Sequence, residues 1–133
     1  MAQGGSTQPK GNWKSLVEFP NTVSKIKSMK SHVEAPLIEA FRGRVEKLVS
    51  AGKAIGGQDQ TETLANADAA LHFQALPSVP VRLNFWDASP DDGFDAEAKL
   101  LFDETITEHL DIESIMFLSE RIAELLIEKG IQP

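Results

Sequence analysis

The 133-residue chain contains no cysteine, no tyrosine and no long apolar run. The missing cysteine excludes disulfide bonds, cysteine nucleophiles and thiolate ligands for zinc or iron–sulfur clusters. No run approaches the ~20 apolar residues that span a bilayer, so no membrane helix is expected. The first ten residues lack the apolar core of a secretory signal. We therefore expect a cytoplasmic protein that makes no contact with a membrane.

The formal net charge of −7 is unevenly distributed along the chain. Residues 1–56 carry nine Lys and Arg against four acidic residues, whereas residues 57–133 carry four against sixteen. Opposite charges favour docking, so we expect the two parts to lie against each other. Nucleic acids are bound mainly through basic surface, and an acidic chain therefore predicts no nucleic-acid partner.

The chain divides into a short tail and one domain. Residues 1–12 are polar and rich in Gly, Ser and Gln, which predicts a disordered tail. The remaining residues, 13–133, fit a single domain of ordinary size. Within this domain, residues 13–19 predict a short extended segment that Pro20 ends.

Three segments show the 3.6-residue periodicity of amphipathic helices. The first begins near Val23, and Pro36 is expected to interrupt it and to occupy the first turn of the next helix. The second helix presents one apolar face and is expected to tolerate Gly43 and to stop at Gly52. The third follows its N-cap, Asp111, towards the C-terminus.

The period changes from 3.6 to two near position 68, which predicts β-strands. Two runs alternate apolar and polar residues, and their apolar members are Leu71, Phe73 and Ala75 in the first run and Val81, Leu83 and Phe85 in the second. We expect a hairpin in which Leu71 lies opposite Phe85, Phe73 opposite Leu83 and Ala75 opposite Val81, because this register buries one apolar face.

A third strand is expected over residues 98–102. The acidic loop before it, residues 87–95, is shorter than the dozen or so residues that a parallel crossover needs, so the third strand should be antiparallel to the second. The predicted fold class is α+β, a three-stranded antiparallel meander packed against two or three helices.

Familiar catalytic and nucleotide-binding motifs are missing from the chain. It has no P-loop, no dinucleotide-binding glycine pattern, no His-Glu-x-x-His and no Gly-x-Ser-x-Gly. His32, His72 and His109 fall on three different elements, without metal-ligand spacing between them. The sequence therefore predicts no catalytic residue, no metal and no cofactor, and it argues against an enzyme.

Two acidic residues at strand ends, Asp87 and Asp103, are candidates for acid–base chemistry. Asp87 and Asp103 each follow an aromatic residue, but the meander places them about 16 Å apart at ~3.3 Å per residue, too far to share a proton. Asp87, Ser89 and Asp91 match the first positions of a calcium loop. The required glycine comes one place late and the last glutamate is missing. We expect a solvated acidic loop, with a weak calcium site as the alternative.

One face of the hairpin combines polar side chains with a large aromatic one. If the alternating apolar residues face the core, the opposite face carries His72, Gln74, Arg82, Asn84 and Trp86. Either a helix or the extended segment around Trp13 covers this face, or it is a binding surface anchored by Trp86 and Arg82, types enriched at binding hot spots. The candidate binding residues are Trp86, Arg82, Asn84, His72 and Asp87.

Several motifs occur in a recognisable order. Residues 76–87 contain Pro-Ser-Val-Pro and end in Phe-Trp-Asp, residues 100–103 read Leu-Leu-Phe-Asp, and residues 109–114 precede the final helix. This order resembles the C-terminal portion of an uncharacterised bacterial and archaeal family, the domain of unknown function 3786. The resemblance implies no established activity. It does imply a further N-terminal portion in relatives, and some relatives are joined to cysteine-rich iron–sulfur segments or lie near corrinoid methyl-transfer proteins.

The sequence favours a non-catalytic binding or interaction module. The edges of a three-stranded sheet invite pairing, so the expected partner is another protein or a second copy, as a homodimer through a sheet edge. The alternative rests on the resemblance alone: an accessory protein of corrinoid or one-carbon metabolism with weak ligand binding. A chain without cysteine cannot itself hold an iron–sulfur cluster.

Overall fold

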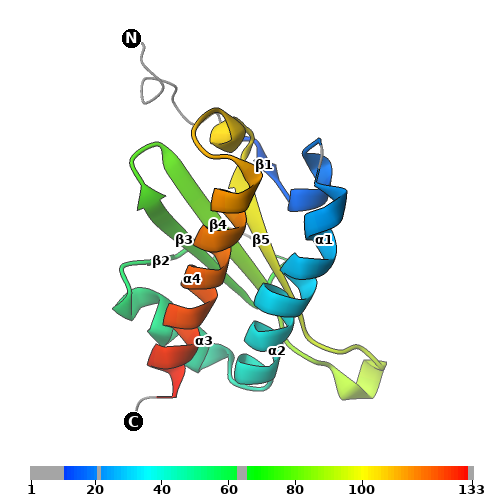
Figure 1. The fold of residues 1–133 in the computed structure, drawn as a ribbon. Helices are drawn as coiled ribbons and strands as arrows, with labels where there is room; N and C mark the ends of the chain where they lie inside the picture. Colours follow the sequence, from blue (N-terminus) through cyan, green and yellow to red (C-terminus); the bar gives the residue numbers. More distant parts are fainter. Residues whose placement is uncertain (1–10, 21, 63–65, 132–133) are drawn as a thin grey trace.

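The computed structural model describes residues 11–20, 22–62 and 66–131. These residues form a five-stranded antiparallel sheet in the order β1-β5-β4-β3-β2. The helices lie together on one face of the sheet (Figure 1). The predicted α+β class is therefore confirmed, and most of the predicted tail lies outside the described residues.

The sheet is larger than predicted. Its strands are β1 (Trp13–Lys14), β2 (Gln58–Asp59), β3 (Ala69–Leu76), β4 (Val79–Trp86) and β5 (Glu97–Asp103). The three long strands form the predicted meander. The two-residue strands β1 and β2 add one edge each, and neither carries enough alternation to be recognised from sequence.

The helical layer consists of three rods. The first runs without a break through α1 (Val23–Met29), a π-helical stretch (Lys30–Glu34) and α2 (Ala35–Phe41), and the others are α3 (Val45–Ala54) and α4 (Ile112–Gly130). Short 3-10 helices occupy Leu16–Glu18, Pro90–Asp92 and Glu104–Glu108. The side chain of Asp111 accepts a hydrogen bond from the amide of Ser114 at 2.8 Å, which confirms the predicted N-cap of α4.

The expected interruption at Pro36 takes the form of a π-helix instead of a break. Proline has no amide hydrogen, so a regular α-helical bond to the residue four places earlier is lost. The amide of Ala35 bonds to the carbonyl of Lys30, five residues back, and this wider turn lets the helix continue. Such π-helical insertions occur frequently at functional sites.

The predictions for Gly43 and Gly52 were wrong. Gly43 does not lie inside a helix: its φ of 73° belongs to the left-handed region, and it separates α2 from α3. Its amide donates to the carboxylate of Asp87 at 2.8 Å, which ties the helix turn to the end of β4. Gly52 does not end α3 but lies within it, where the helix packs closely on Leu71 of β3.

The predicted hairpin register was also wrong, by two residues. Leu71 pairs with Leu83, and Phe85 pairs with Ala69. The turn contains only Pro77 and Ser78, and a shift between Gln74 and Leu76 absorbs an extra residue. Because side chains alternate with a period of two, this slip leaves the residues before the shift, such as Leu71 and Phe73, on their predicted face.

The extended segment predicted for residues 13–19 is much shorter. Only Trp13 and Lys14 pair with β5. The amide of Ser15 then donates to the carboxylate of Glu18 at 2.7 Å, forming a capping box that starts a 3-10 helix. The chain therefore turns away from β5 after two residues.

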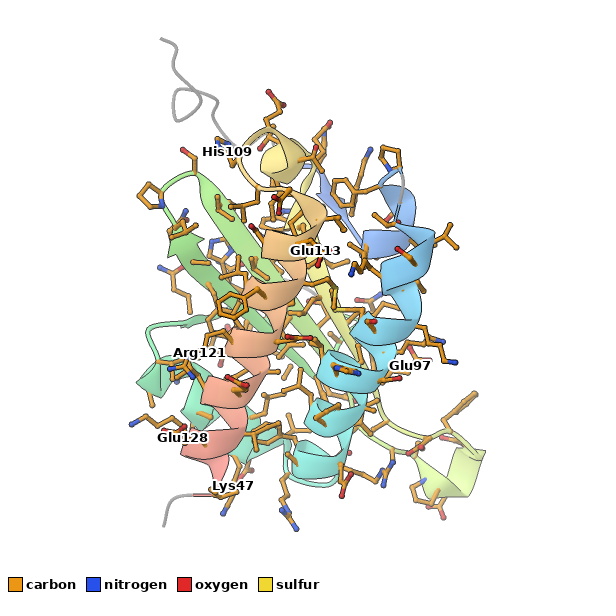
Figure 2. All side chains as sticks on the ribbon, in the orientation of Figure 1. Lys47, Glu97, His109, Glu113, Arg121 and Glu128 are labelled. Atoms are coloured by element: carbon orange, nitrogen blue, oxygen red, sulfur yellow. The ribbon has the colours of Figure 1, made fainter. Side chains whose placement is uncertain are left out.

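Ion pairs join the basic and acidic parts of the chain. Lys25 Nζ lies 2.8 Å from Glu113 Oε1 on α4, a residue labelled in Figure 2. Arg42 Nε lies 3.0 Å from Asp95 Oδ1. The expected packing of the two parts is confirmed, although exposed pairs of this kind contribute no more than about 1 kcal/mol each.

Gly52 gives a test of the packing between α3 and the sheet. A Gly→Ala change inside a helix normally stabilises it by about 1 kcal/mol. Here the new Cβ would lie 2.6 Å from Cδ1 of Leu71, which is 1% exposed. We expect Gly52→Ala to lower the free energy of unfolding by about 1–3 kcal/mol in urea denaturation. Ser50→Ala, at an exposed position of the same helix, should be neutral or stabilising, and a stabilised G52A would contradict the close contact.

Candidate functional site

The predicted binding residues share the sheet face opposite the helices, which we call the open face. The register places His72 opposite Arg82 and Trp86 opposite Glu97. Asn84 lies between Arg82 and Trp86 on the same face of β4, paired with Ala70. The structure therefore brings these side chains together as expected from the two-residue period.

Trp13 covers part of the open face. The Cζ atom of Arg82 lies 4.3 Å from the centroid of the Trp13 ring, within cation–π distance. The ring of His72 meets Trp13 edge-on, with 5.8 Å between centroids. Of the two covering elements expected, the extended Trp13 segment is the one observed. Its contact with Arg82 depends on β1 pairing with β5, which no local pattern revealed.

Trp86 and Asp87 have structural partners at the far end of β4. The indole N–H of Trp86 donates to the carbonyl of Asn66. The amide of Asp87 donates to Asp68, while its carboxylate accepts from Gly43 and Ala88. Asp87 therefore joins the loop before β3 and the α2–α3 turn to the strand end.

Asp87 and Asp103 lie at opposite ends of the sheet, as predicted. Asp87 follows Trp86, which pairs with the first residue of β5, whereas Asp103 is the last residue of β5. Asp103 is buried and accepts hydrogen bonds from the amides of Gly11 and Thr105. It anchors the start of the domain to the end of β5.

The acidic loop has its own internal hydrogen bonds. The hydroxyl of Ser89 donates to the carboxylate of Asp92 at 2.8 Å, and the carboxylate of Asp87 is held by the α2–α3 turn. Across residues 11–20, 22–62 and 66–131, no cluster of three or more His, Asp or Glu side chains is placed to hold a metal ion.

A cleft of about 490 Å³ lies between the α1–α2 rod and β5. Its apolar lining comes from Leu16, Val17, Ile26, Met29, Ile38 and Leu100. Its polar lining includes Lys30 and Glu34 from the π-helical stretch and Glu97 and Lys99 from β5. Figure 2 shows Glu97 on the side of the molecule where this rod runs. Sequence analysis missed this site, because its walls are distant in the chain.

The wall formed by β5 is a sheet edge. β1 pairs with β5 only at Phe102 and Asp103, so among the described residues no strand lies beside residues 97–101 on this side. The amide of Glu104 donates to the carbonyl of Asn12, just before β1. The backbone N–H and C=O groups of even-numbered residues in β5 therefore point away from β4. Because these directions alternate along a strand, the amides and carbonyls of Ala98 and Leu100 face the cleft.

Glu34 is the half-buried titratable group of the cleft. Burial raises the pKa of its carboxyl above 4.5, and the positive charges of Lys99 and Lys30 oppose this effect. No hydrogen bond or ion pair joins Glu34 to another residue in the described part of the chain. An apolar cleft with a perturbed carboxyl is a typical ligand site.

The fold and the cleft together define an α+β domain with an open sheet edge beside a helical rod. The chain belongs to a known family: a family model described as Domain of unknown function (DUF3786) matches residues 1–125. No curated protein and no solved structure matches the chain. Within the described ranges, no helix combines the length and apolarity needed to cross a membrane.

The raised pKa of Glu34 predicts a pH-dependent stability. A carboxyl whose pKa is raised on folding binds its proton more tightly in the folded state, so stability falls as pH rises above 4.5. We expect Glu34→Gln to be more stable than the wild type near pH 7, with the difference vanishing near pH 3.5. Urea denaturation at both pH values measures it.

Glu39→Gln, at an exposed position on α2, is the matched control and should give no such difference. A Glu34→Gln variant that is less stable than the wild type at neutral pH would show that attraction to Lys30 or Lys99 outweighs the cost of burial.

Proposed function

We propose that this protein is a non-catalytic binding module that accepts an extended segment of a partner protein as an additional strand on β5. The observation that supports this is the unpaired edge at residues 97–101, which forms one wall of the cleft. Strand addition at an open sheet edge is a common way of binding peptides, because main-chain hydrogen bonds supply affinity for any extended sequence.

The cleft supplies the specificity that such binding needs. Side chains of an added strand point alternately to the two faces of the sheet. Those on the helical side would enter the cleft and contact apolar residues such as Ile26 and Met29. Val17, 62% exposed, adds apolar surface at its rim. We therefore expect a segment with apolar residues at every second position.

A peptide segment fits this edge better than a second copy. A two-fold antiparallel pairing of two β5 edges would place both helical layers on the same side of the joined sheet. The α1–α2 rod runs along this side of β5 (Figure 1), so the two rods would meet above the new strand pair. A bare extended segment brings no helix and avoids this crowding. The homodimer therefore becomes an alternative outcome of the test.

Binding requires a small rearrangement of the cleft. Ala98 and Leu100 are each 3% exposed, so side chains at the rim must move apart before a strand can bond to both. This ordering cost lowers affinity. We expect dissociation constants in the micromolar range, which correspond to a binding free energy of about −8 kcal/mol. The corrinoid-related alternative stays a prediction, and no contact described above favours it.

A pair of proline variants tests the edge. Ala98→Pro removes an amide that faces the cleft, whereas Lys99→Pro removes an amide that faces Asn84 in the β4–β5 ladder. Proline is tolerated where the amide points away from the sheet. We expect Ala98→Pro to remain folded in urea denaturation and Lys99→Pro to lose about 1–3 kcal/mol more, for the carbonyl left without its donor.

Peptides selected from a random linear library on the wild-type protein are the probe. We expect them to alternate apolar residues and to bind Ala98→Pro at least tenfold more weakly in fluorescence anisotropy. Glu128→Gln, on the exposed side of α4 (Figure 2), should bind them normally. Equal binding to Ala98→Pro would refute strand addition. A dimer in light scattering that this variant dissociates would assign the edge to a second copy.

A further inference from the structure

Arg82 is a half-buried cation without an acidic partner. Its Nε atom is buried and has no hydrogen-bond partner among the described residues. None of the ion pairs in the described part of the chain includes Arg82, and its side chain makes no hydrogen bond there. Burial lowers the pKa of its guanidinium group, in keeping with a charge that has lost part of its water.

The missing partner is not hidden in the rest of the sequence. Residues 1–10, 21, 63–65 and 132–133 contain no Asp and no Glu. Every acidic side chain of the protein is therefore described, and none pairs with Arg82. A charge that is removed from water without a counter-ion costs free energy. An anion that binds to Arg82 would therefore stabilise the folded protein.

The guanidinium group is held in position from one side. Its Cζ atom lies 4.3 Å from the centroid of the Trp13 ring, and this contact restricts the side chain while its terminal nitrogens make no hydrogen bond to a described residue. A planar, oriented guanidinium group is suited to two parallel hydrogen bonds with a carboxylate or a phosphate. Because the protein has already fixed the group, little further entropy is lost when an anion binds.

The neighbouring groups also favour an anion. His72 lies directly opposite Arg82 on β3, and Lys99 lies opposite Asn84 on the same face of β5. The acidic side chains on this face are Glu97, opposite Trp86, and Asp103, which already accepts hydrogen bonds from Gly11 and Thr105. Arg82 lies opposite Leu101, so the register places Lys99 nearer to Arg82 along β5 than Glu97.

Asn84 provides a polar contact for the rest of a ligand. It is 8% exposed, and its Oδ1 atom has no hydrogen-bond partner within the described residues. Buried polar atoms are nearly always bonded in folded proteins. Because Oδ1 is buried, the Asn84 side chain must rotate before this acceptor can receive a hydrogen bond from a hydroxyl or amino group of a ligand whose anionic end meets Arg82.

We propose that Arg82, stacked on Trp13 and flanked by His72, binds the oxyanion of a small organic ligand, a carboxylate or a phosphate, on the open face of the sheet. This site lies on the face opposite the helices and goes beyond the strand-addition function. The anion site and the strand-addition site can be tested independently, because a substitution of the Arg82 side chain leaves the backbone groups of the β5 edge unchanged.

His72 makes the binding depend on pH. Burial, and then the charge of Arg82, lowers the pKa of His72 below 6.5. A bound oxyanion favours the protonated imidazole and so raises this pKa. Affinity should therefore increase as pH falls through the His72 pKa and level off below it.

NMR titration of the ¹⁵N-labelled wild-type protein tests the proposal. The probes are inorganic phosphate and malonate, added separately at constant ionic strength. We expect the Arg82 Nε–H and Trp13 indole N–H resonances to shift saturably with at least one probe, and the His72 pKa to rise in its presence. Saturation by phosphate alone identifies a phosphate ligand, and saturation by malonate alone identifies a carboxylate.

Variants of Arg82 and Arg121 distinguish anion binding at a specific site from general electrostatic attraction. Arg82→Gln should weaken binding at least tenfold, and Arg82→Lys, which keeps the charge but not the planar fork, should weaken it by an intermediate factor. Arg121→Gln, which removes an exposed charge on α4 (Figure 2), should have no effect. If Arg82→Gln does not fold, the test uses Arg82→Lys instead. This variant should bind more weakly than the wild type, and the bound probe should raise its His72 pKa by a smaller amount. Shifts that do not saturate across the millimolar range, or that Arg121→Gln reduces equally, overturn the proposal.

Discussion

The two-residue alternation of β3, β4 and β5 is the constraint on which the rest of the structure depends. It places residues such as Leu71, Leu83 and Phe85 on one face, where each is no more than 1% exposed beneath the helices. The burial of this face stabilises the sheet by about 25 cal/mol for each Å² of apolar surface removed from water. The same alternation necessarily directs Arg82 and His72 to the other face. The same alternation therefore builds the core on one face of the sheet and presents the residues of the proposed anion site on the other.

A second constraint comes from the short first strand. The capping box between Ser15 and Glu18 bends the chain into a 3-10 helix and so removes it from β5. A longer β1 would have covered the edge beside Ala98 and Leu100. The local hydrogen bonds of one polar residue therefore leave a sheet edge open and create the cleft. Natural proteins usually protect such edges, which makes this one a natural place for a partner.

Glu34 and Arg82 are charged side chains that lie partly out of solvent. Glu34 lies in the cleft and Arg82 on the open face, and neither forms an ion pair with a described residue. Burial moves the pKa of each towards the neutral form. Their positions on opposite faces explain why they do not neutralise each other. Uncompensated charges that cost stability are typical of surfaces retained for binding.

Periodicity alone was enough to predict the three long strands and the C-terminal helix. The meander, the N-cap at Asp111 and the separation of Asp87 from Asp103 all follow from residues close together in sequence. The hairpin register was missed by two residues, because a slip of two keeps residues such as Leu71 and Leu83 on the same face and so leaves the alternating pattern unchanged. Gly43 was misplaced: it takes a left-handed conformation between α2 and α3, where its amide donates to Asp87, 44 positions away.

The candidate sites were also predictable from the sequence only in part. The chain's own pattern assigned His72, Arg82, Asn84 and Trp86 to one face, since side-chain direction in a strand is a local property. The stacking of Trp13 on Arg82 and the cleft around Glu34 arise only in the folded molecule. Both need segments between about 60 and 90 residues apart to pack together, and the free energy of such contacts depends on the whole fold and leaves no short-range trace in the sequence.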